Sequence, residues 1–255
     1  MADELDSKFA GDEQPQRGEL IMLGSESSCG YLSGRMSQME YRFAFSLTDR
    51  HYEQLLERGW RRFGRMIFRP KCRTCRECRS LRIVLDRFQP SKSQRRCRTR
   101  NRAIQVEIGP PDVTDEHLSL YNRYHLDMHR RRNWPFRMIT RDEYSESFLE
   151  GRFPFSREFR YLLNGQLVAI GIVDMTESAM SSIYFFHDPE LRHAGLGTYS
   201  VLSEIAEGQR TARHRLYLGY YIRECGSMNY KNRFAPHEIL RDYVGDDELP
   251  LWEVP

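Results

Sequence analysis

Three cysteines at two-residue gaps are the residues of this chain best suited to metal chemistry. Cys72, Cys75 and Cys78 form a C-x-x-C-x-x-C run, and Cys29 is a distant fourth sulfur. Thiolates at this spacing can bind Zn²⁺ or an iron–sulfur cluster when consecutive turns bring the sulfurs together. The neighbouring arginines are expected to lower the thiol pKa values and so favour the thiolate. Free thiols, some of them buried as small apolar residues, are the alternative interpretation.

A dense run of arginines surrounds these cysteines. Between Arg61 and Arg102 there are sixteen Lys/Arg and two acids, a balance of +14, whereas the whole chain is +3 and the rest therefore carries −11. This segregation, with Trp60, Phe63 and Phe68 interleaved, predicts a polyanion partner. Structured RNA contacted through its shape and backbone is the default partner. A solvated charged face is the alternative interpretation.

Two segments of the second half place glycine and polar residues where strands end. The first runs from Tyr184 to Ser200 and contains a Gly-Leu-Gly turn that opens a helix, where backbone N–H groups could hold a phosphate or a carbonyl oxygen. In the second, Leu218-Gly-Tyr-Tyr-Ile222 leads into Met228-Asn-Tyr-Lys-Asn-Arg-Phe234. Both segments indicate a candidate site, although a tight turn and an ordinary core edge would give similar patterns.

Hydrophobic periodicity predicts the elements that position these residues. Helices are expected over 49–59, 114–131, 141–149 and 197–212. Strands are expected over 60–69, 81–85, 158–163, 166–174, 179–186 and 216–222, with Asn164-Gly165 as a type I′ hairpin turn. Helices followed by a strand meander, a helix and a strand are an α+β plan.

Composition bounds the class of protein. The 255 residues are 40% hydrophobic, which is enough for a packed core in one large or two small domains. The chain contains no run of about 18 apolar residues and no secretory signal, so we expect a cytoplasmic protein that does not associate with a membrane. We expect a disordered tail over 1–19, a Cys/Arg-rich N-terminal domain over 20–105 and a second domain over 106–255.

Six motifs occur in order along the chain. They are Cys29-Gly-Tyr-Leu, Phe68-Arg-Pro-x-Cys-x-x-Cys-x-x-Cys, Phe88-x-Pro-Ser-Lys-Ser-Gln-Arg-Arg, Tyr184-Phe-Phe-x-Asp-Pro, Leu196-Gly-Thr-Tyr-Ser, and Leu218-Gly-Tyr-x-Ile with Met228-Asn-Tyr-Lys-x-Arg-Phe. Together they resemble the aminoacyl-tRNA–protein transferases over about residues 20–241. Phe68 departs from the family pattern, in which Tyr is usual.

The resemblance implies an N-degron enzyme that moves leucine from leucyl-tRNA to proteins with an N-terminal Asp or Glu. It implies a GNAT-like acyltransferase fold for the second half, after a small Cys-containing domain. It also carries zinc or iron–sulfur binding onto the four cysteines, Cys29, Cys72, Cys75 and Cys78.

Two alternatives stay open at this point. Arginyl transfer from arginyl-tRNA would need a carboxylate such as Asp174 or Asp188, whereas Ile170, Ile172 and Phe186 could line a leucine pocket. A non-catalytic RNA-binding module with a structural zinc is the alternative from another class.

The implied reaction is aminolysis of an activated ester, which needs no cofactor for the chemistry. The enzyme must position two substrates, remove a proton and stabilise an oxyanion. The expected catalytic residues, which would orient the amine and the ester, are Tyr184, Asp188, Tyr220 and Tyr230.

Substrate binding is expected from three groups of residues. Arg95 and Arg96 would pair with the acidic side chain of the acceptor, since a guanidinium matches a carboxylate bidentately. Backbone N–H groups at Gly197 and Thr198 would hold the oxyanion or the terminal ribose. Lys231 and Arg233 would contact the tRNA end, and the remaining candidates are Ser93, Gln94, Tyr199 and Asn229.

Overall fold

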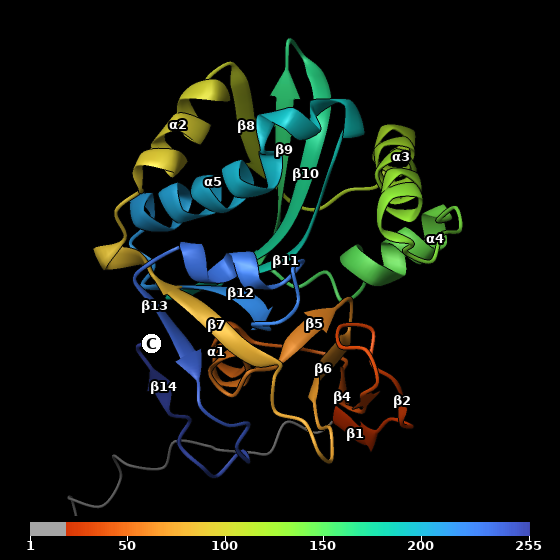
Figure 1. Ribbon diagram of the computed structural model, residues 1–255, viewed down its shortest axis with the longest axis vertical. Helices are drawn as coiled ribbons and strands as arrows, with labels where there is room; N and C mark the ends of the chain where they lie inside the picture. Colours follow the sequence, from red (N-terminus) through yellow and green to blue (C-terminus); the bar gives the residue numbers. More distant parts are fainter. Residues whose placement is uncertain (1–18) are drawn as a thin grey trace, which may run out of the picture.

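Two main β-sheets organise the chain, whose computed structural model describes residues 19–255 (Figure 1). One sheet has four strands in the order β1-β4-β6-β5, the other has eight in the order β14-β13-β7-β12-β11-β10-β9-β8, and β2 pairs with β3. The strands are β1 Glu19–Leu23, β2 Ser27–Ser28, β3 Met36–Ser37, β4 Met39–Ala44, β5 Arg61–Phe63, β6 Met66–Pro70, β7 Arg79–Val84, β8 Ile104–Gly109, β9 Ser156–Leu163, β10 Gln166–Met175, β11 Ala179–His187, β12 Arg215–Tyr221, β13 His237–Leu240 and β14 Trp252–Glu253. The predicted tail lies outside the described residues, except for Glu19.

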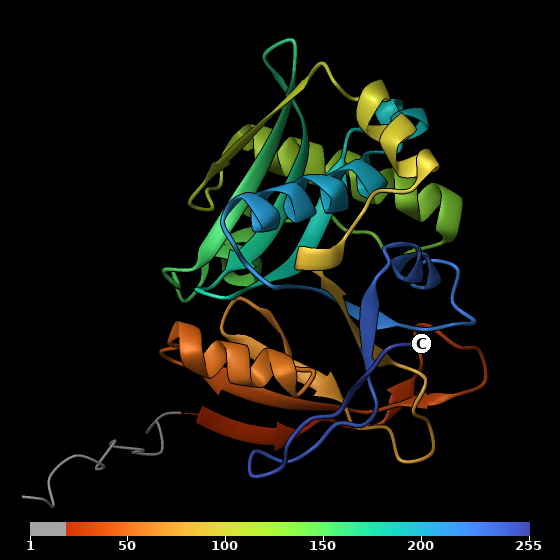
Figure 2. The same ribbon diagram turned by 90° about the vertical axis from the view of Figure 1, so that its left-hand side faces the viewer.

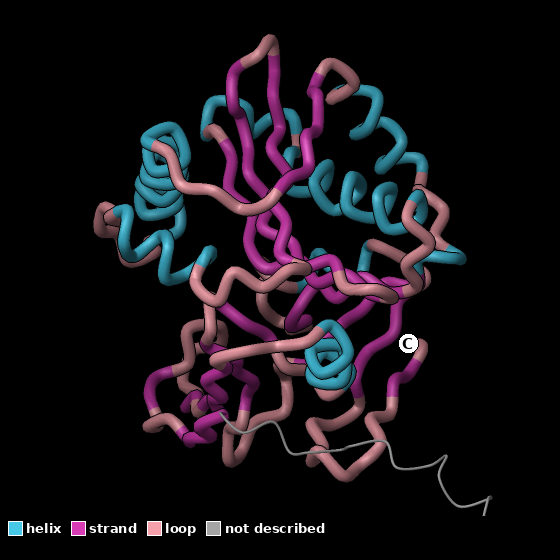
Figure 3. Tube along the Cα trace, turned by 180° about the vertical axis from the view of Figure 1, so that it is seen from behind, coloured by secondary structure: helices cyan, strands magenta, loops and turns pink. Residues whose placement is uncertain are grey.

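The helices cover both faces of the eight-stranded sheet. They are α1 Asp49–Glu57, α2 Lys92–Arg100, α3 Asp115–Arg132, α4 Arg141–Tyr144 and α5 Leu196–Arg210, with shorter turns η1 Leu85–Arg87, η2 Ser145–Leu149, η3 Pro189–Ala194 and η4 Asn229–Arg233. Helices α2 and α5 lie on one face, and α3 and α4 lie on the other (Figures 1 and 3). Each face therefore buries its own apolar cluster. No helix within residues 19–255 is long and apolar enough to cross a membrane.

Local signals account for the helices that flank the candidate site. Helix α1 begins after the cap Thr48, whose side chain accepts from the N–H of His51, and the chain leaves it through Gly59 at φ +81°. Helix α3 begins after Thr114 and ends at Asn133 in the left-handed region. Both predicted helices are confirmed.

The predicted meander is confirmed as β9, β10 and β11. Asn164 and Gly165 have φ values of 52° and 78°, which a type I′ turn requires of both central residues. Strand β12 joins β11 in parallel, and the other neighbouring pairs in this sheet are antiparallel. The helix predicted over 197–212 is confirmed as α5.

Two predicted elements differ in the structure. Residues 60–69 form a hairpin of β5 and β6 rather than one strand, because the chain turns at Gly64, whose φ is +51°. The helix predicted over 141–149 is regular only to Tyr144 and continues as the π-helical turn η2. The basic segment that follows Ser91 forms α2, which a capping box starts.

The eight-stranded sheet takes strands from both halves of the chain, within an α+β architecture. Strand β7, from the first half, lies between β13 and β12 of the second half. Helix α1 covers the four-stranded sheet (Figure 2), and Leu55 and Leu56 pack in one cluster with Phe155 and Tyr217. Strand β7 therefore joins the segment before the expected domain boundary near residue 105 to the sheet of the segment after it, and the boundary itself stays a prediction.

Candidate active site

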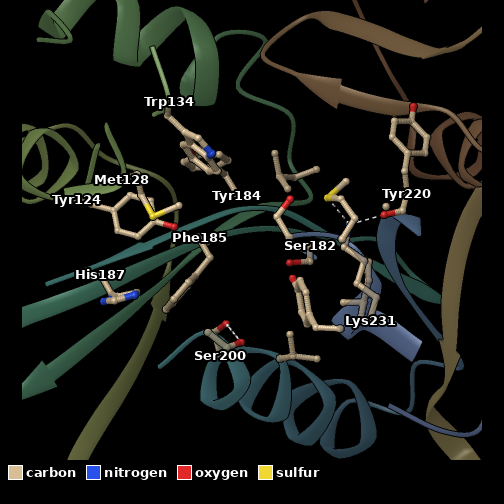
Figure 4. A pocket seen from close by; sticks show the side chains of 18 of the residues that line it. Tyr124, Met128, Trp134, Ser182, Tyr184, Phe185, His187, Ser200, Tyr220 and Lys231 are labelled. Atoms are coloured by element: carbon tan, nitrogen blue, oxygen red, sulfur yellow. Dashed lines mark hydrogen bonds between the residues drawn. The ribbon is translucent and has the colours of Figure 1, made fainter. Parts of the chain in front are cut away.

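A cavity of ≈ 620 Å³ lies where the two sheets meet. Its walls come from the β5–β6 hairpin, from α3, and from β11, α5, β12 and η4, which follow one another along the chain (Figure 4). Aromatic and basic side chains dominate the lining, which includes Tyr31, Arg61, Phe63, Phe68, Tyr124, Asp127, Met128, Trp134, Ser182, Tyr184, His187, Gly197, Ser200, Tyr220, Tyr230 and Lys231. A cavity of this size and mixed character can hold a small apolar side chain beside polar groups.

Five residues predicted from the sequence line this cavity: Tyr184, Gly197, Tyr220, Tyr230 and Lys231. Three of them are tyrosines. Burial raises the pKa values of Tyr184 and Tyr220 well above the ordinary range, and raises the pKa of Tyr230 to about 12. These phenols therefore stay protonated at neutral pH and can donate hydrogen bonds, but they cannot act as bases.

Two of the tyrosine hydroxyls already have partners. The Tyr184 oxygen lies 2.9 Å from Nε2 of His125, a ring whose pKa burial lowers to about 4 and which is therefore neutral. The Tyr220 hydroxyl donates to the carbonyl of Phe68 at 3.1 Å. Tyr220 thus joins β12 to the four-stranded sheet and presents its ring to the cavity.

The other predicted residues of the second half lie outside the lining. Asp188 caps η3 through the N–H of Glu190 at 3.0 Å and pairs with Arg123 at 2.9 Å. The N–H of Thr198 donates to Gly195 at 3.0 Å, so among the two predicted N–H groups only that of Gly197 remains for a substrate. Tyr199 packs against the core, Asn229 donates to the carbonyl of Arg223, and Arg233 is exposed.

The four predicted residues on α2 also lie away from the cavity lining. Gln94 closes the capping box with Ser91 and donates to the carbonyl of Arg233 at 3.0 Å. Ser93 shares a hydrogen bond with the hydroxyl of Ser91. Arg95 and Arg96 are exposed, and Arg95 donates to the carbonyl of Pro90. Their expected contact with the acceptor stays a prediction.

The residues expected to line a leucine pocket lie elsewhere. Ile170, Ile172 and Phe186 are fully buried in the cluster beneath α3, together with Leu120 and Tyr144. They pack the core rather than the cavity because α3 and α4 cover this face of β10 and β11. Among the cavity residues, Phe63, Phe68 and Met128 supply an apolar wall instead.

Several lining residues were missed from the sequence. Asp127 of α3 binds Arg192 at 2.6 Å and Arg131 at 3.2 Å. Asp127 and Arg131 stand four residues apart on α3, and Tyr124 and Met128 share this face, so helical spacing could have grouped them. Arg61 reaches the cavity through the hairpin of β5 and β6, and no spacing pattern in the sequence predicts that hairpin.

Two buried titratable groups stand at or behind the cavity wall. Burial lowers the pKa of Lys231 to about 7, and the positive charge of Arg61 contributes a smaller part of this shift. Glu204 of α5 accepts from the hydroxyl of Ser182 at 3.3 Å, and its second oxygen has no partner among the described residues. Burial raises the pKa of Glu204 to about 8, so this carboxyl is mostly neutral at pH 7.

The Glu204 carboxyl gives a pH-dependent stability. It titrates near 4.5 in the unfolded chain and near 8 in the folded protein, so between these values the folded state holds an extra proton. The free energy of unfolding is therefore expected to fall as pH rises through this window, by about 1.4 kcal/mol per pH unit, and Glu204→Gln should remove that slope. Urea unfolding of the unmodified protein and of Glu204→Gln, at about pH 5 and about pH 8, measures this change in the free energy of unfolding. An equal change with pH in the two proteins would contradict the assignment.

The four cysteines line a second cavity of ≈ 370 Å³ that shares Tyr31, Phe63, Phe68 and Tyr220 with the first. Within residues 19–255, no group of three or more His, Cys, Asp or Glu side chains is arranged to hold a metal ion. Burial, followed by the neighbouring thiols, raises the pKa of Cys78 to about 12. The expectation that nearby arginines favour its thiolate is therefore wrong for Cys78.

Comparisons with known proteins agree with the motifs. The family profile described as arginine-tRNA-protein transferase, N terminus, matches residues 27–96, and the profile of its C terminus matches residues 116–241. The aspartate/glutamate leucyltransferase of Helicobacter hepaticus is 35% identical over 236 residues, which cover 92% of this chain and 98% of the relative. That of Halorhodospira halophila is 39% identical over 216 residues, covering 83% and 90%.

A solved structure described as L-PGS from Bacillus licheniformis is similar to this chain, with a TM-score of 0.41 and 14% sequence identity. The similarity covers 57% of this chain and 47% of the solved chain. The sequence relatives carry the assignment and confirm the predicted resemblance. The chain belongs to the arginine-tRNA–protein transferase family and is an aminoacyltransferase of the branch that contains the aspartate/glutamate leucyltransferases.

Proposed function

We propose that this chain transfers leucine from leucyl-tRNA to the N-terminal Asp or Glu of acceptor proteins, within an N-degron pathway. The names of its relatives support this reaction, and the cavity between the sheets supplies a place for it. An ester donor is already activated. The protein therefore has to orient the amine and ester, remove a proton and stabilise the oxyanion.

The charge of the lining favours a leucyl donor over an arginyl donor. Among the described lining residues, Asp127 is the carboxylate, and each of its oxygens is bound to an arginine. Asp174 is fully buried and held by Arg62, and Asp188 caps η3 beside Arg123. The guanidinium of an arginyl donor would thus meet no free carboxylate, whereas leucine needs only the apolar wall.

The reaction forms one amide bond and breaks one ester bond. The acceptor amine, whose pKa is near ~8, attacks the carbonyl carbon in its neutral form. The N–H of Gly197, at the positive end of the α5 dipole, is available to the oxyanion. The hydroxyl of Tyr184 can donate to the substrate, and the proton lost by the amine ends on the departing ribose oxygen.

The partners follow from the same arrangement. Helix α2 exposes four arginines (Arg95, Arg96, Arg98 and Arg100) and packs against α5, whose N-terminal turn lines the cavity. This face would bind tRNA phosphates, with the exposed Arg233 nearer the aminoacyl end. Base-specific contacts are not required, because the ester identifies the reacting end of the tRNA.

Two finer assignments belong to the proposal. The second half would be a GNAT-like acyltransferase domain, which the order β9, β10, β11, α5, β12 supports. The sulfurs of Cys29, Cys72, Cys75 and Cys78 line one cavity, and they would have to move closer together to hold a zinc ion or an iron–sulfur cluster, because the described side chains are not arranged as metal ligands. Such a group would fix the loop that carries Tyr31, and it supplies no step of the transfer.

The experiment that tests this function follows labelled leucine from leucyl-tRNA onto synthetic peptides. Peptides that begin with Asp or Glu should gain leucine, whereas an otherwise identical peptide that begins with Ala should not. Binding of the tRNA should weaken steeply with salt, because phosphate contacts release counterions. Salt-sensitive tRNA binding with no leucylated peptide would favour the non-catalytic RNA-binding alternative.

A further inference from the structure

Two buried cations on the cavity wall have only neutral partners. Arg61 of β5 is 7% exposed and donates to the hydroxyl of Ser181 at 2.8 Å and to the carbonyls of Tyr217 and Ser182. Lys231 of η4 is also 7% exposed, and its Nζ donates to the carbonyl of Tyr220 at 2.6 Å. Neither side chain has an ion pair with a described carboxylate.

These two cations converge on the same point of β12. Gly219 has φ +80°, and a Cβ built there would lie 3.1 Å from Nε of Arg61. Lys231 binds the carbonyl of the next residue, Tyr220, and Arg61 is close enough to lower the pKa of Lys231. Figure 4 places Lys231 and Tyr220 on the side of the cavity opposite Tyr124 and His187.

The surrounding groups leave this charge uncompensated. The other buried arginine of the lining, Arg62, is neutralised by Asp174, and Arg131 and Arg192 share Asp127 at the rim. Glu204 behind Ser182 is mostly protonated at neutral pH. Cys78 also lies close enough to influence Lys231, but burial raises the pKa of its thiol to about 12, so it carries no compensating negative charge at neutral pH. Unpaired buried cations are costly, so the site favours an anionic ligand.

We propose that Arg61 and Lys231 bind the side-chain carboxylate of the acceptor's N-terminal Asp or Glu. This assignment rests on the proposed leucyl transfer and identifies the residues that recognise the acceptor protein. In Asp only two carbons, and in Glu three, separate this carboxylate from the reacting amine. The residues that bind this carboxylate must therefore lie in the same cavity as the ester. Arg61 and Lys231 line that cavity, whereas the exposed arginines of α2 do not.

A selectivity measurement tests the assignment. Leucyl transfer is followed with saturating leucyl-tRNA and two peptides that differ only in an N-terminal Glu or Gln, which have the same shape. Lys231→Met removes the charge but keeps an unbranched side chain in a buried position. It is expected to lower the Glu-over-Gln ratio of kcat/KM by about 10- to 100-fold, since a hydrogen bond to a charged group is lost.

Three further variants complete the test. Arg61→Lys keeps a charge but loses the guanidinium fork, and should lower the same ratio by about 10-fold. Lys231→Arg should keep most of the preference, because a cation remains. Arg210→Gln, which removes an exposed charge bound to Glu207, should leave the ratio unchanged.

The outcomes separate the subsite from the reaction itself. An unchanged ratio in both Lys231→Met and Arg61→Lys would overturn the proposal, as would an equal loss of rate on the Glu and Gln peptides. Arg95→Ala is measured beside them, and a ratio that falls in this variant but not in Lys231→Met or Arg61→Lys would assign the carboxylate to α2. If the unmodified protein transfers no leucine to either peptide while it binds leucyl-tRNA, the proposed function fails, whatever the cations bind.

Discussion

Replacing Arg62 by Met is expected to lower the free energy of unfolding by about 3–5 kcal/mol, which is the cost of leaving one member of a buried ion pair without its partner. The Arg62 and Asp174 side chains are 1% and 0% exposed. Nε of Arg62 donates to Asp174 at 2.7 Å, its Nη2 to Ser156 at 2.6 Å and its Nη1 to the Gly64 carbonyl at 2.9 Å. The variant leaves the Asp174 carboxylate buried and unneutralised.

Chemical denaturation of three variants measures this effect. The double variant Arg62→Met/Asp174→Leu should recover most of the loss, because an apolar pair can replace a buried ion pair at little cost. Arg210→Met, at an exposed ion pair, should leave the free energy of unfolding nearly unchanged. A loss under about 1 kcal/mol in Arg62→Met would show that the pair is solvated and that β5 is not anchored to β10 through it.

Replacing Gly197 by Phe is expected to reduce leucyl transfer by at least about 100-fold, because the ring would displace the substrates from a productive position. Gly197 lines the cavity in the first turn of α5, and a Cβ there would meet no atom within 4 Å. The added side chain therefore projects into open space. The free energy of unfolding should change by less than about 1 kcal/mol, since a helical glycine tolerates a side chain.

The control for this variant is Gly197→Ala, whose methyl group should leave most of the transfer rate intact. Binding of uncharged tRNA should persist in Gly197→Phe, because the arginines of α2 proposed to contact its phosphates lie outside the cavity lining. Near-normal transfer by a folded Gly197→Phe protein would place the ester elsewhere in the molecule.

Elements with local signals could be predicted, and elements created by long-range contacts could not. Caps and the Asn164-Gly165 turn identify α1, α3 and the β9–β10 hairpin, because short-range hydrogen bonds and positive φ angles fix them. The turn at Gly64 interrupts an alternating pattern that suits one longer strand. The position of β7 between β12 and β13 depends on pairing across more than a hundred residues, which periodicity does not encode.

The candidate site divides in the same way. Motif residues on β11, α5 and η4 identified Tyr184, Gly197 and Lys231, because strand ends and helix starts collect polar groups at one edge of a sheet. Arg61 reaches the cavity only because the β5–β6 hairpin faces β12. In the sequence, Arg61 is one of sixteen basic residues between positions 61 and 102. In the structure, Arg61 differs from its basic neighbours because it is buried and has no ion pair with a described carboxylate.

A leucyl donor is expected in this cavity because, among the lining residues that the structure describes, no carboxylate is free to pair with the guanidinium of arginine. This expectation is tested most directly by offering leucyl-tRNA and arginyl-tRNA, separately labelled and at equal concentration, with one peptide that begins with Glu. The product is expected to carry leucine and almost no arginine. A product that carries arginine in equal or greater amount would contradict it, because a carboxylate in the cavity would then have to be free to receive the guanidinium.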